Sequence, residues 1–157
     1  MTDAVPATLE DIVLPALLRH ARTTYGQAMR TALAEAGCDD VPRNGLYVIG
    51  ALALGEYPVA QLIRDLRVSK QAAAQLIDAL VLRGYLCREG HDTDRRRIVL
   101  SLTERGQAAA EAQRAARERV DTELATRVGE DAVQQTRKTL AALVKIGLEH
   151  EASDAED

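Results

Sequence analysis

Aromatic residues are scarce in this 157-residue chain, which has four Tyr and neither Phe nor Trp. A hydrophobic core must therefore consist of Leu, Val, Ile and Ala, and the small Ala side chain favours closely packed helices. The two cysteines, Cys38 and Cys87, are too few for a disulfide framework. Apolar residues make up 46% of the chain and charged residues 28%, a balance that predicts one compact domain with a buried core.

Long hydrophobic runs are also missing. No apolar stretch approaches the roughly 18 residues that span a bilayer. Residues 1–12 lack the basic region and the apolar run of a signal peptide. These two absences predict a cytoplasmic protein.

The net charge of −4 excludes a uniformly basic nucleic-acid binder, but the charges are unevenly distributed. Residues 1–59 have four basic and seven acidic side chains, residues 60–105 have nine and six, and residues 106–157 have seven and eleven. The middle segment, with a net charge of +3, is the only positive one. A local basic surface is what contact with phosphates requires, whatever the total charge.

Hydrophobic periodicity and turn residues predict six helices and one β-hairpin. Pro15 lies beyond the first turn of the first helix, which therefore has either a kink or a later start. Ser69 and Thr103 are predicted N-caps, and the acidic segment 151–157 is predicted to be disordered. The helices are expected at residues 9–36, 46–54, 59–66, 70–83, 104–127 and 132–148, and the strands at 85–89 and 97–102.

Residues 42–103 combine two short helices, a tight turn and a β-hairpin, in that order. This order is typical of a winged helix-turn-helix. In such a module the second helix enters the major groove of DNA with its N-terminal side chains, and the hairpin reaches the backbone or the minor groove beside it. The predicted fold class is therefore mainly α with one β-hairpin, a winged helix-turn-helix.

Two groups of polar side chains in this module are suited to DNA. The second helix begins with Ser69, Lys70 and Gln71, which can bind phosphates or base edges. The hairpin tip has Asp94 followed by the arginine run 95–97, and arginine is favoured in narrow minor grooves. Asp94 is predicted to pair with one of these arginines and orient it. The alternatives are an ordinary exposed helix face and a solvated turn.

Three stretches together resemble the MarR family of bacterial regulators: residues 69–86 (SKQAAAQLIDALVLRGYL), Asp94-Arg95-Arg96, and Leu102-Thr103 with Gly106. The resemblance extends over about residues 9–150. It implies a homodimer whose N- and C-terminal helices, residues 1–36 and 104–150, form the dimerisation region. It also implies a palindromic operator in double-stranded DNA and a repressor that is relieved by a small ligand or by oxidation. By the same resemblance the DNA contacts come from Ser69, Lys70, Gln71, Gln75, Arg95 and Arg96. Arg97, the last residue of the arginine run, is expected to bind DNA with them.

The chain departs from the family in two places. Ala72, Ala73 and Ala74 stand where many relatives have polar or β-branched residues, and alanine cannot hydrogen-bond to a base edge. Arg67 stands where the turn between the two helices often has Gly. With the acidic total charge, these departures keep open a second interpretation, a winged-helix module that binds another protein. A third interpretation, a small enzyme with a pocket in a helix bundle, has no catalytic motif to support it.

Histidines, cysteines and tyrosines offer few further sites. His20, on the apolar face of the first helix, is either a core histidine or part of an effector pocket with Tyr25 and Tyr47. Cys38 lies beside two aspartates, whose negative charges disfavour a reactive thiolate, and Cys87 is expected to pack within the hairpin. No His or Cys pair has metal-ligand spacing, so neither a metal nor a cofactor is expected.

Overall fold

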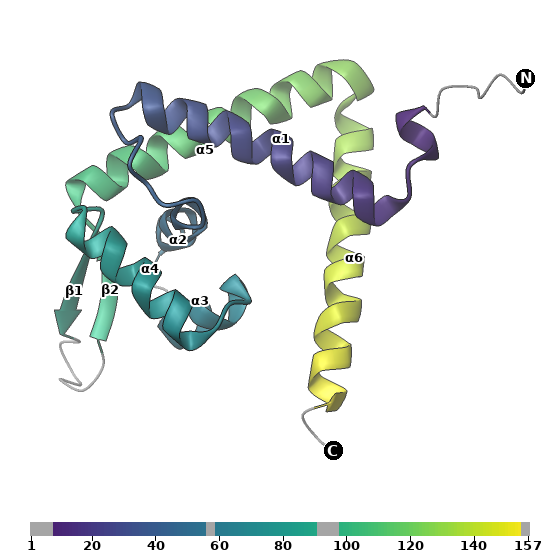
Figure 1. Ribbon diagram of the computed structural model, residues 1–157. Helices are drawn as coiled ribbons and strands as arrows, with labels where there is room; N and C mark the ends of the chain where they lie inside the picture. The colour runs from purple at the N-terminus through teal and green to yellow at the C-terminus, as the bar shows by residue number, and fades with distance from the viewer. Residues whose placement is uncertain (1–7, 56–58, 91–97, 155–157) are drawn as a thin grey trace, which may run out of the picture. The chain divides into compact units, whose positions relative to one another are not determined.

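The computed structural model describes residues 8–55, 59–90 and 98–154 (Figure 1). The chain divides into two compact units, residues 1–117 and 118–157. The first unit contains the short helix η1 (Leu9–Asp11), the helices α1 (Leu14–Glu35), α2 (Gly45–Leu52), α3 (Val59–Leu66) and α4 (Lys70–Leu82), the strands β1 (Leu86–Gly90) and β2 (Ile98–Leu102), and the beginning of α5 (Glu104–Val128). The second unit contains the rest of α5 and the helix α6 (Glu130–Asp154).

The fold is mainly helical with a two-stranded wing, as the sequence predicts. Helix α1 begins at Leu14 with Pro15 in its first turn, where a missing N–H costs no helical hydrogen bond. Of the two alternatives for this helix, the later start is therefore correct. The strands β1 and β2 pair antiparallel, with Leu86 opposite Leu102 and Gly90 opposite Ile98.

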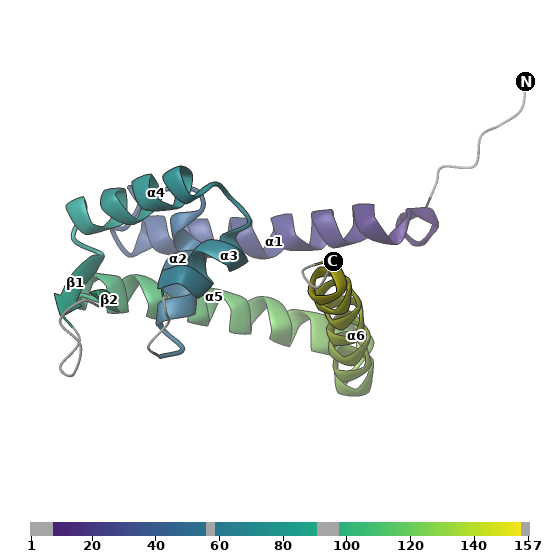
Figure 2. The same ribbon diagram turned by 90° about the horizontal axis from the view of Figure 1, so that it is seen from below.

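The core of the first unit surrounds α2, which packs between α4 and α5 (Figure 2). A Cβ on Gly45 would lie 3.0 Å from the Leu80 side chain of α4, and a Cβ on Gly50 would lie 3.7 Å from the Gln113 amide of α5. The largest fully buried aliphatic side chains come from α2, α3, α4 and the hairpin: Leu46, Val48, Ile49, Leu62, Leu80 and Leu86. Because α2 has glycine at these two positions, α4 and α5 can both approach it closely.

The second unit shows one difference from the sequence prediction. Helix α6 continues to Asp154, so the acidic segment that was predicted to be disordered from residue 151 begins as the last turn of a helix. Arg137 of α6 forms an ion pair with Asp121 of α5 at 2.9 Å. Along the rest of α6 four large apolar side chains are 44–61% exposed: Leu143, Val144, Ile146 and Leu148.

Candidate nucleic-acid interface

Helix α4 presents a polar face at its N-terminus. The Oγ of Ser69 accepts a hydrogen bond from the Ala72 N–H at 3.1 Å, which confirms the predicted N-cap. Ala73, Ile77 and Leu80 are buried against the core. The structure therefore brings four of the predicted DNA-binding residues together on the solvent side of one helix: Ser69, Lys70, Gln71 and Gln75.

An ion pair links this helix to the wing. Asp78 lies two turns after Gln71 on the same exposed face, and its Oδ1 accepts a hydrogen bond from the guanidinium of Arg88 on β1. Sequence reasoning missed this pair, although an acidic residue seven positions after Gln71 shares its helix face. The candidate interface therefore includes a carboxylate that is held by an arginine.

The tip of the wing lies outside the residues that the structure describes. Asp94 and the arginine run 95–97 fall between the described segments 59–90 and 98–154, so the proposed roles of these four residues remain predictions. The described base of the wing is well packed, since Leu86 and Leu100 are each 2% exposed.

The turn between α3 and α4 has a left-handed residue. Arg67 has a φ of 50°, a conformation that costs an L-residue roughly 1–2 kcal/mol and that glycine adopts freely. In the family that the sequence resembles, this turn position often has Gly. The turn therefore keeps its geometry without the glycine, and the departure leaves the helix-turn-helix intact.

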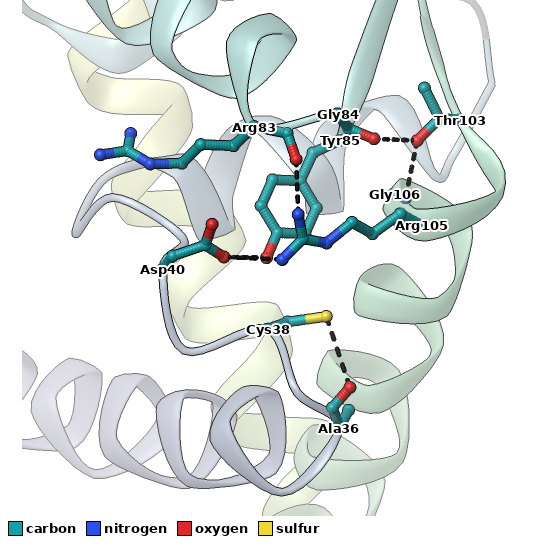
Figure 3. A network of polar contacts seen from close by, with 9 residues as sticks. All are labelled: Ala36, Cys38, Asp40, Arg83, Gly84, Tyr85, Thr103, Arg105 and Gly106. Carbon is teal, nitrogen blue, oxygen red and sulfur yellow. Dashed lines mark hydrogen bonds and ion pairs between the residues drawn. The ribbon is translucent and has the colours of Figure 1, made fainter.

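Behind α4 a polar network connects three segments that are distant in the sequence (Figure 3). The hydroxyl of the fully buried Tyr85 donates a hydrogen bond to Oδ1 of Asp40. Arg105 of α5 donates to the same carboxylate at 3.0 Å and to the Arg83 carbonyl at 2.7 Å, and its guanidinium lies 4.4 Å from the centre of the Tyr85 ring. The network joins the loop after α1, the end of α4 and the start of α5.

The electrostatics of this network favour a neutral tyrosine beside an ionised aspartate. Burial, followed by the hydrogen bond to Asp40, raises the pKa of Tyr85. The hydrogen bond from Tyr85, with the charge of Arg105, lowers the pKa of Asp40. The network therefore holds one fixed pattern of protonation around neutral pH.

Close backbone packing completes the network. Thr103 caps α5, because its Oγ1 accepts from the Gly106 N–H at 3.0 Å, and it also donates to the Gly84 carbonyl at 2.5 Å. A Cβ on Gly106 would lie 2.1 Å from the Tyr85 carbonyl oxygen, so no other residue fits there. Cys38 is buried nearby, and its Sγ lies 3.7 Å from the Ala36 carbonyl.

The cavities of the first unit include two that described residues line. One, of about 530 Å³, lies between the end of α2, strand β2 and α5, and has a mixed apolar and charged wall that includes Leu54, Leu102 and Arg117. The other, of about 360 Å³, lies between α1 and the start of α2, and Tyr47 is in its wall.

Of the three residues predicted for an effector pocket, Tyr47 lies in the wall of the second cavity, and neither Tyr25 nor His20 lines either of these two. Tyr25 is half-buried and packs against the core. His20 is exposed, so the expectation of a core histidine is wrong, because this turn of α1 has no core beneath it.

Among the described residues, no three His, Cys, Asp or Glu side chains form a group that could hold a metal ion. Over the same part of the chain, no helix is long and apolar enough to cross a membrane.

The capped recognition helix, the left-handed turn and the two-stranded wing define a winged helix-turn-helix protein. Residues 39–97 match the model of the MarR family.

Solved structures share the fold over most of the chain. A crystal structure of MarR has 20% sequence identity and a TM-score of 0.73, with 94% of this chain and 99% of that chain covered. Wild-type MarR from E. coli in its apo form has 20% identity and a TM-score of 0.62, with 84% and 97% covered. The transcriptional repressor CouR, bound to a 23-mer DNA duplex, has 21% identity and a TM-score of 0.65, with 84% and 92% covered. No curated protein matches the sequence well enough to add to these comparisons.

Proposed function

We propose that this protein is a sequence-specific DNA-binding regulator, a ligand-responsive repressor that binds a palindromic operator as a homodimer. The observation that carries the proposal is the Ser69-capped α4, whose exposed polar N-terminal face lies next to a β-hairpin. CouR, a repressor of the same fold whose structure contains a DNA duplex, supports the assignment of this surface to DNA.

The chemistry of α4 suits the major groove. The unpaired N–H groups at its start, with Ser69 and Lys70, favour phosphate oxygens. Gln71 and Gln75, one turn apart on the exposed face, can each pair with the N6 and N7 atoms of adenine. The alanines beside them contribute at most a contact with a thymine methyl group. Part of the specificity therefore comes from the wing arginines and from DNA shape.

A homodimer doubles this interface. The apolar side chains that α6 exposes provide surface for a second copy. Two recognition helices about 34 Å apart then meet successive turns of one face of the duplex. A ligand that binds more tightly to a form of the dimer with a different distance between its two recognition helices weakens DNA binding by linkage.

The test is a salt titration of binding to duplex DNA. We expect affinity to fall steeply with salt, because each neutralised phosphate contributes a slope of about −0.9 in log K against log salt. Replacing Arg95 and Arg96 with Ala should reduce both the affinity and the slope. The control is Arg127→Ala, which removes an exposed arginine of α5 that pairs with Glu123. Binding that ignores salt, or equal effects of the wing and control variants, would contradict the proposal.

One observation favours a second candidate, a winged helix that binds another protein. Leu82 lies at the end of α4 on the same side as Asp78 and is 88% exposed. An exposed leucine is a natural contact for a protein partner. This candidate predicts no duplex binding at any ionic strength, which the same titration measures.

A further inference from the structure

Four arginines gather on one surface of an otherwise acidic segment. Residues 1–59 have a net charge of −3 and only four basic side chains. All four are exposed and line the cavity between α1 and the start of α2, whereas no acidic residue in the described part of the segment does. We call this group the arginine surface: Arg19, Arg22, Arg30 and Arg43.

Among the described residues, the arginine surface lacks acidic partners. Elsewhere the described arginines often pair with acids, as Arg88 does with Asp78 and Arg137 with Asp121. None of the four arginines of this surface forms an ion pair within the same part of the chain. The surface is therefore left with four positive charges that a partner can neutralise.

One of the four guanidinium groups is held in place. The Nε of Arg22 donates a hydrogen bond to the Tyr47 hydroxyl at 3.0 Å, and its guanidinium lies 4.8 Å from the centre of the Tyr47 ring. The Nη groups of Arg22 remain for another acceptor. Because an arginine in a protein cannot lose its proton, the four charges persist and repel one another. The arginine surface therefore favours a partner with several negative charges.

The end of α6 has the opposite charge. Residues 149–157 contain five acidic side chains and neither lysine nor arginine. Helix α6 continues through residues 149–154, which we call the acidic end, and Glu149 and Glu151 are exposed there. The last turn of a helix is the negative end of its dipole, which basic side chains usually stabilise, and this turn has none. The acidic end therefore favours positive charge from elsewhere.

Exposed apolar residues adjoin both charged surfaces. On α6 the four exposed apolar side chains between residues 143 and 148 come directly before the acidic end. On α1, Val13 and Leu14 are 70% and 54% exposed and lie less than two turns before Arg19. An interface that buries the apolar residues of both helices brings their oppositely charged neighbours within reach of one another.

We propose that the acidic end of α6 binds the arginine surface of a second copy of the chain, a contact that rests on the homodimer of the proposed function. Arginine and carboxylate groups match in shape, since the planar guanidinium donates two parallel hydrogen bonds. The apolar residues supply most of the affinity. The charges select which surfaces meet, because pairing two copies of the same surface would place like charges together. In a two-fold dimer the contact occurs twice.

The experiment measures the dissociation constant of the full-length dimer by sedimentation velocity over a dilution series. Arg19→Glu with Arg43→Glu reverses two charges of the arginine surface, and Glu149→Lys with Glu151→Lys reverses two charges of the acidic end. At low salt we expect each double variant to dimerise at least about tenfold more weakly than wild type. An exposed ion pair contributes up to roughly fivefold, and each contact occurs twice.

Salt separates a charge contact from a packing defect. Raising the salt concentration from about 50 mM to about 500 mM should weaken the wild-type dimer, because screening reduces the attraction between exposed charges. The double variants have lost that attraction, so their dissociation constants should change less. The difference between wild type and variants should therefore narrow at high salt. Circular dichroism should show the same helical content in all of them.

Mixing the two double variants tests whether the contact joins two chains. In the mixed dimer one contact has both wild-type surfaces, and the reversed side chains of the other contact attract one another. We expect the mixed dimer to be at least about tenfold tighter than the homodimer of either variant. A contact within one chain would stay broken in both variants, so a mixture as weak as its components would overturn the proposal.

Two further variants serve as controls. Arg64→Glu with Arg88→Glu makes the same change of charge on α3 and β1, outside the arginine surface, and should dimerise as wild type does. Arg19→Lys with Arg43→Lys keeps both charges and should remain within about threefold of wild type.

Four other results would also overturn the proposal. The first is wild-type dimerisation of both charge-reversal variants at low salt, and the second is a defect of equal size at low and high salt. The third is equal weakening by Arg64→Glu with Arg88→Glu. The fourth is an unchanged dimer in Arg19→Glu with Arg43→Glu whose duplex affinity falls as far as that of Lys70→Ala, since the arginine surface would then hold DNA phosphates.

The two proposals fail separately. A dimer that responds to charge reversal but binds no duplex DNA keeps the contact and overturns the DNA-binding function. A dimer that binds duplex DNA but ignores charge reversal keeps the function and overturns the contact.

Discussion

Tyr85 shows how one residue can connect distant parts of this chain. Its ring is fully buried, its hydroxyl contacts a residue 45 positions earlier, and Arg105 covers its face. The neutral phenol is the form that fits, because burial and the Asp40 carboxylate both oppose its ionisation. The stability of the protein should therefore depend on pH in the alkaline range.

The prediction concerns Tyr85→Phe. A folded-state pKa above the unfolded value of about 10 means that the unfolded chain ionises first, so the stability from Tyr85 is complete below pH 10 and falls as pH rises above it. At pH 11 we expect wild type to have lost about 1 kcal/mol more than Tyr85→Phe, each relative to its own value at pH 7. Urea denaturation at both pH values measures this, with Tyr47→Phe as the control. Equal losses in wild type and Tyr85→Phe would refute it.

Among the secondary-structure elements, α4 and β1 form the surface that the proposed function assigns to DNA. The Asp78 carboxylate on the exposed face of α4 opposes phosphates, and it also occupies the Arg88 guanidinium of β1. Both effects lower the attraction for DNA of any sequence. The ion pair therefore suits a regulator that must leave non-specific sites quickly.

Asp78→Asn should consequently bind random-sequence duplex DNA more tightly. The change removes one negative charge and releases Arg88, so we expect a gain of about three- to tenfold at low salt and a salt slope steeper by about one. Stability should change by less than about 0.5 kcal/mol, because both side chains are largely exposed. Fluorescence anisotropy across a salt series measures affinity. As control, Glu123→Gln breaks a similar exposed pair on α5 and should leave DNA binding unaltered.

At the scale of the whole molecule, α6 has more apolar surface than its own unit buries. Val133 is 7% exposed, whereas Val144 and Leu148, farther along the same face, are 61% and 56% exposed. Isolated exposed leucines are ordinary, but several along one helix indicate a missing partner. A second copy of the chain is the partner that the proposed function requires.

Val144→Asp with Leu148→Asp should therefore produce a monomer in light scattering after size exclusion. A buried carboxylate without a partner costs several kcal/mol, enough to dissociate a small interface. Operator affinity should fall with the dimer, because one half-site contributes only part of the binding. Gln135→Asp, on the opposite side of α6, should remain dimeric. A dimer that survives the double substitution would rule out this face as the interface.

The features that could be predicted from the sequence are local. Helix periodicity, the caps Ser69 and Thr103, and the late start of α1 at Pro15 depend on residues within a few positions of one another, and the structure confirms each. The polar N-terminal face of α4 was predictable for the same reason. The location of His20 was not, because helix periodicity marks a face without showing what covers it.

The sequence alone thus determined the succession of helices, turn and hairpin, and with it the winged helix-turn-helix, because backbone preferences act over one or two turns. Only the tertiary structure decided which distant residues meet. It placed Asp40 between Tyr85 and Arg105, paired Asp78 with Arg88, and gathered the four basic residues of an acidic segment around one cavity. These contacts between distant residues depend on how the helices pack. Many side chains together determine that packing geometry, so no single position in the sequence encodes it.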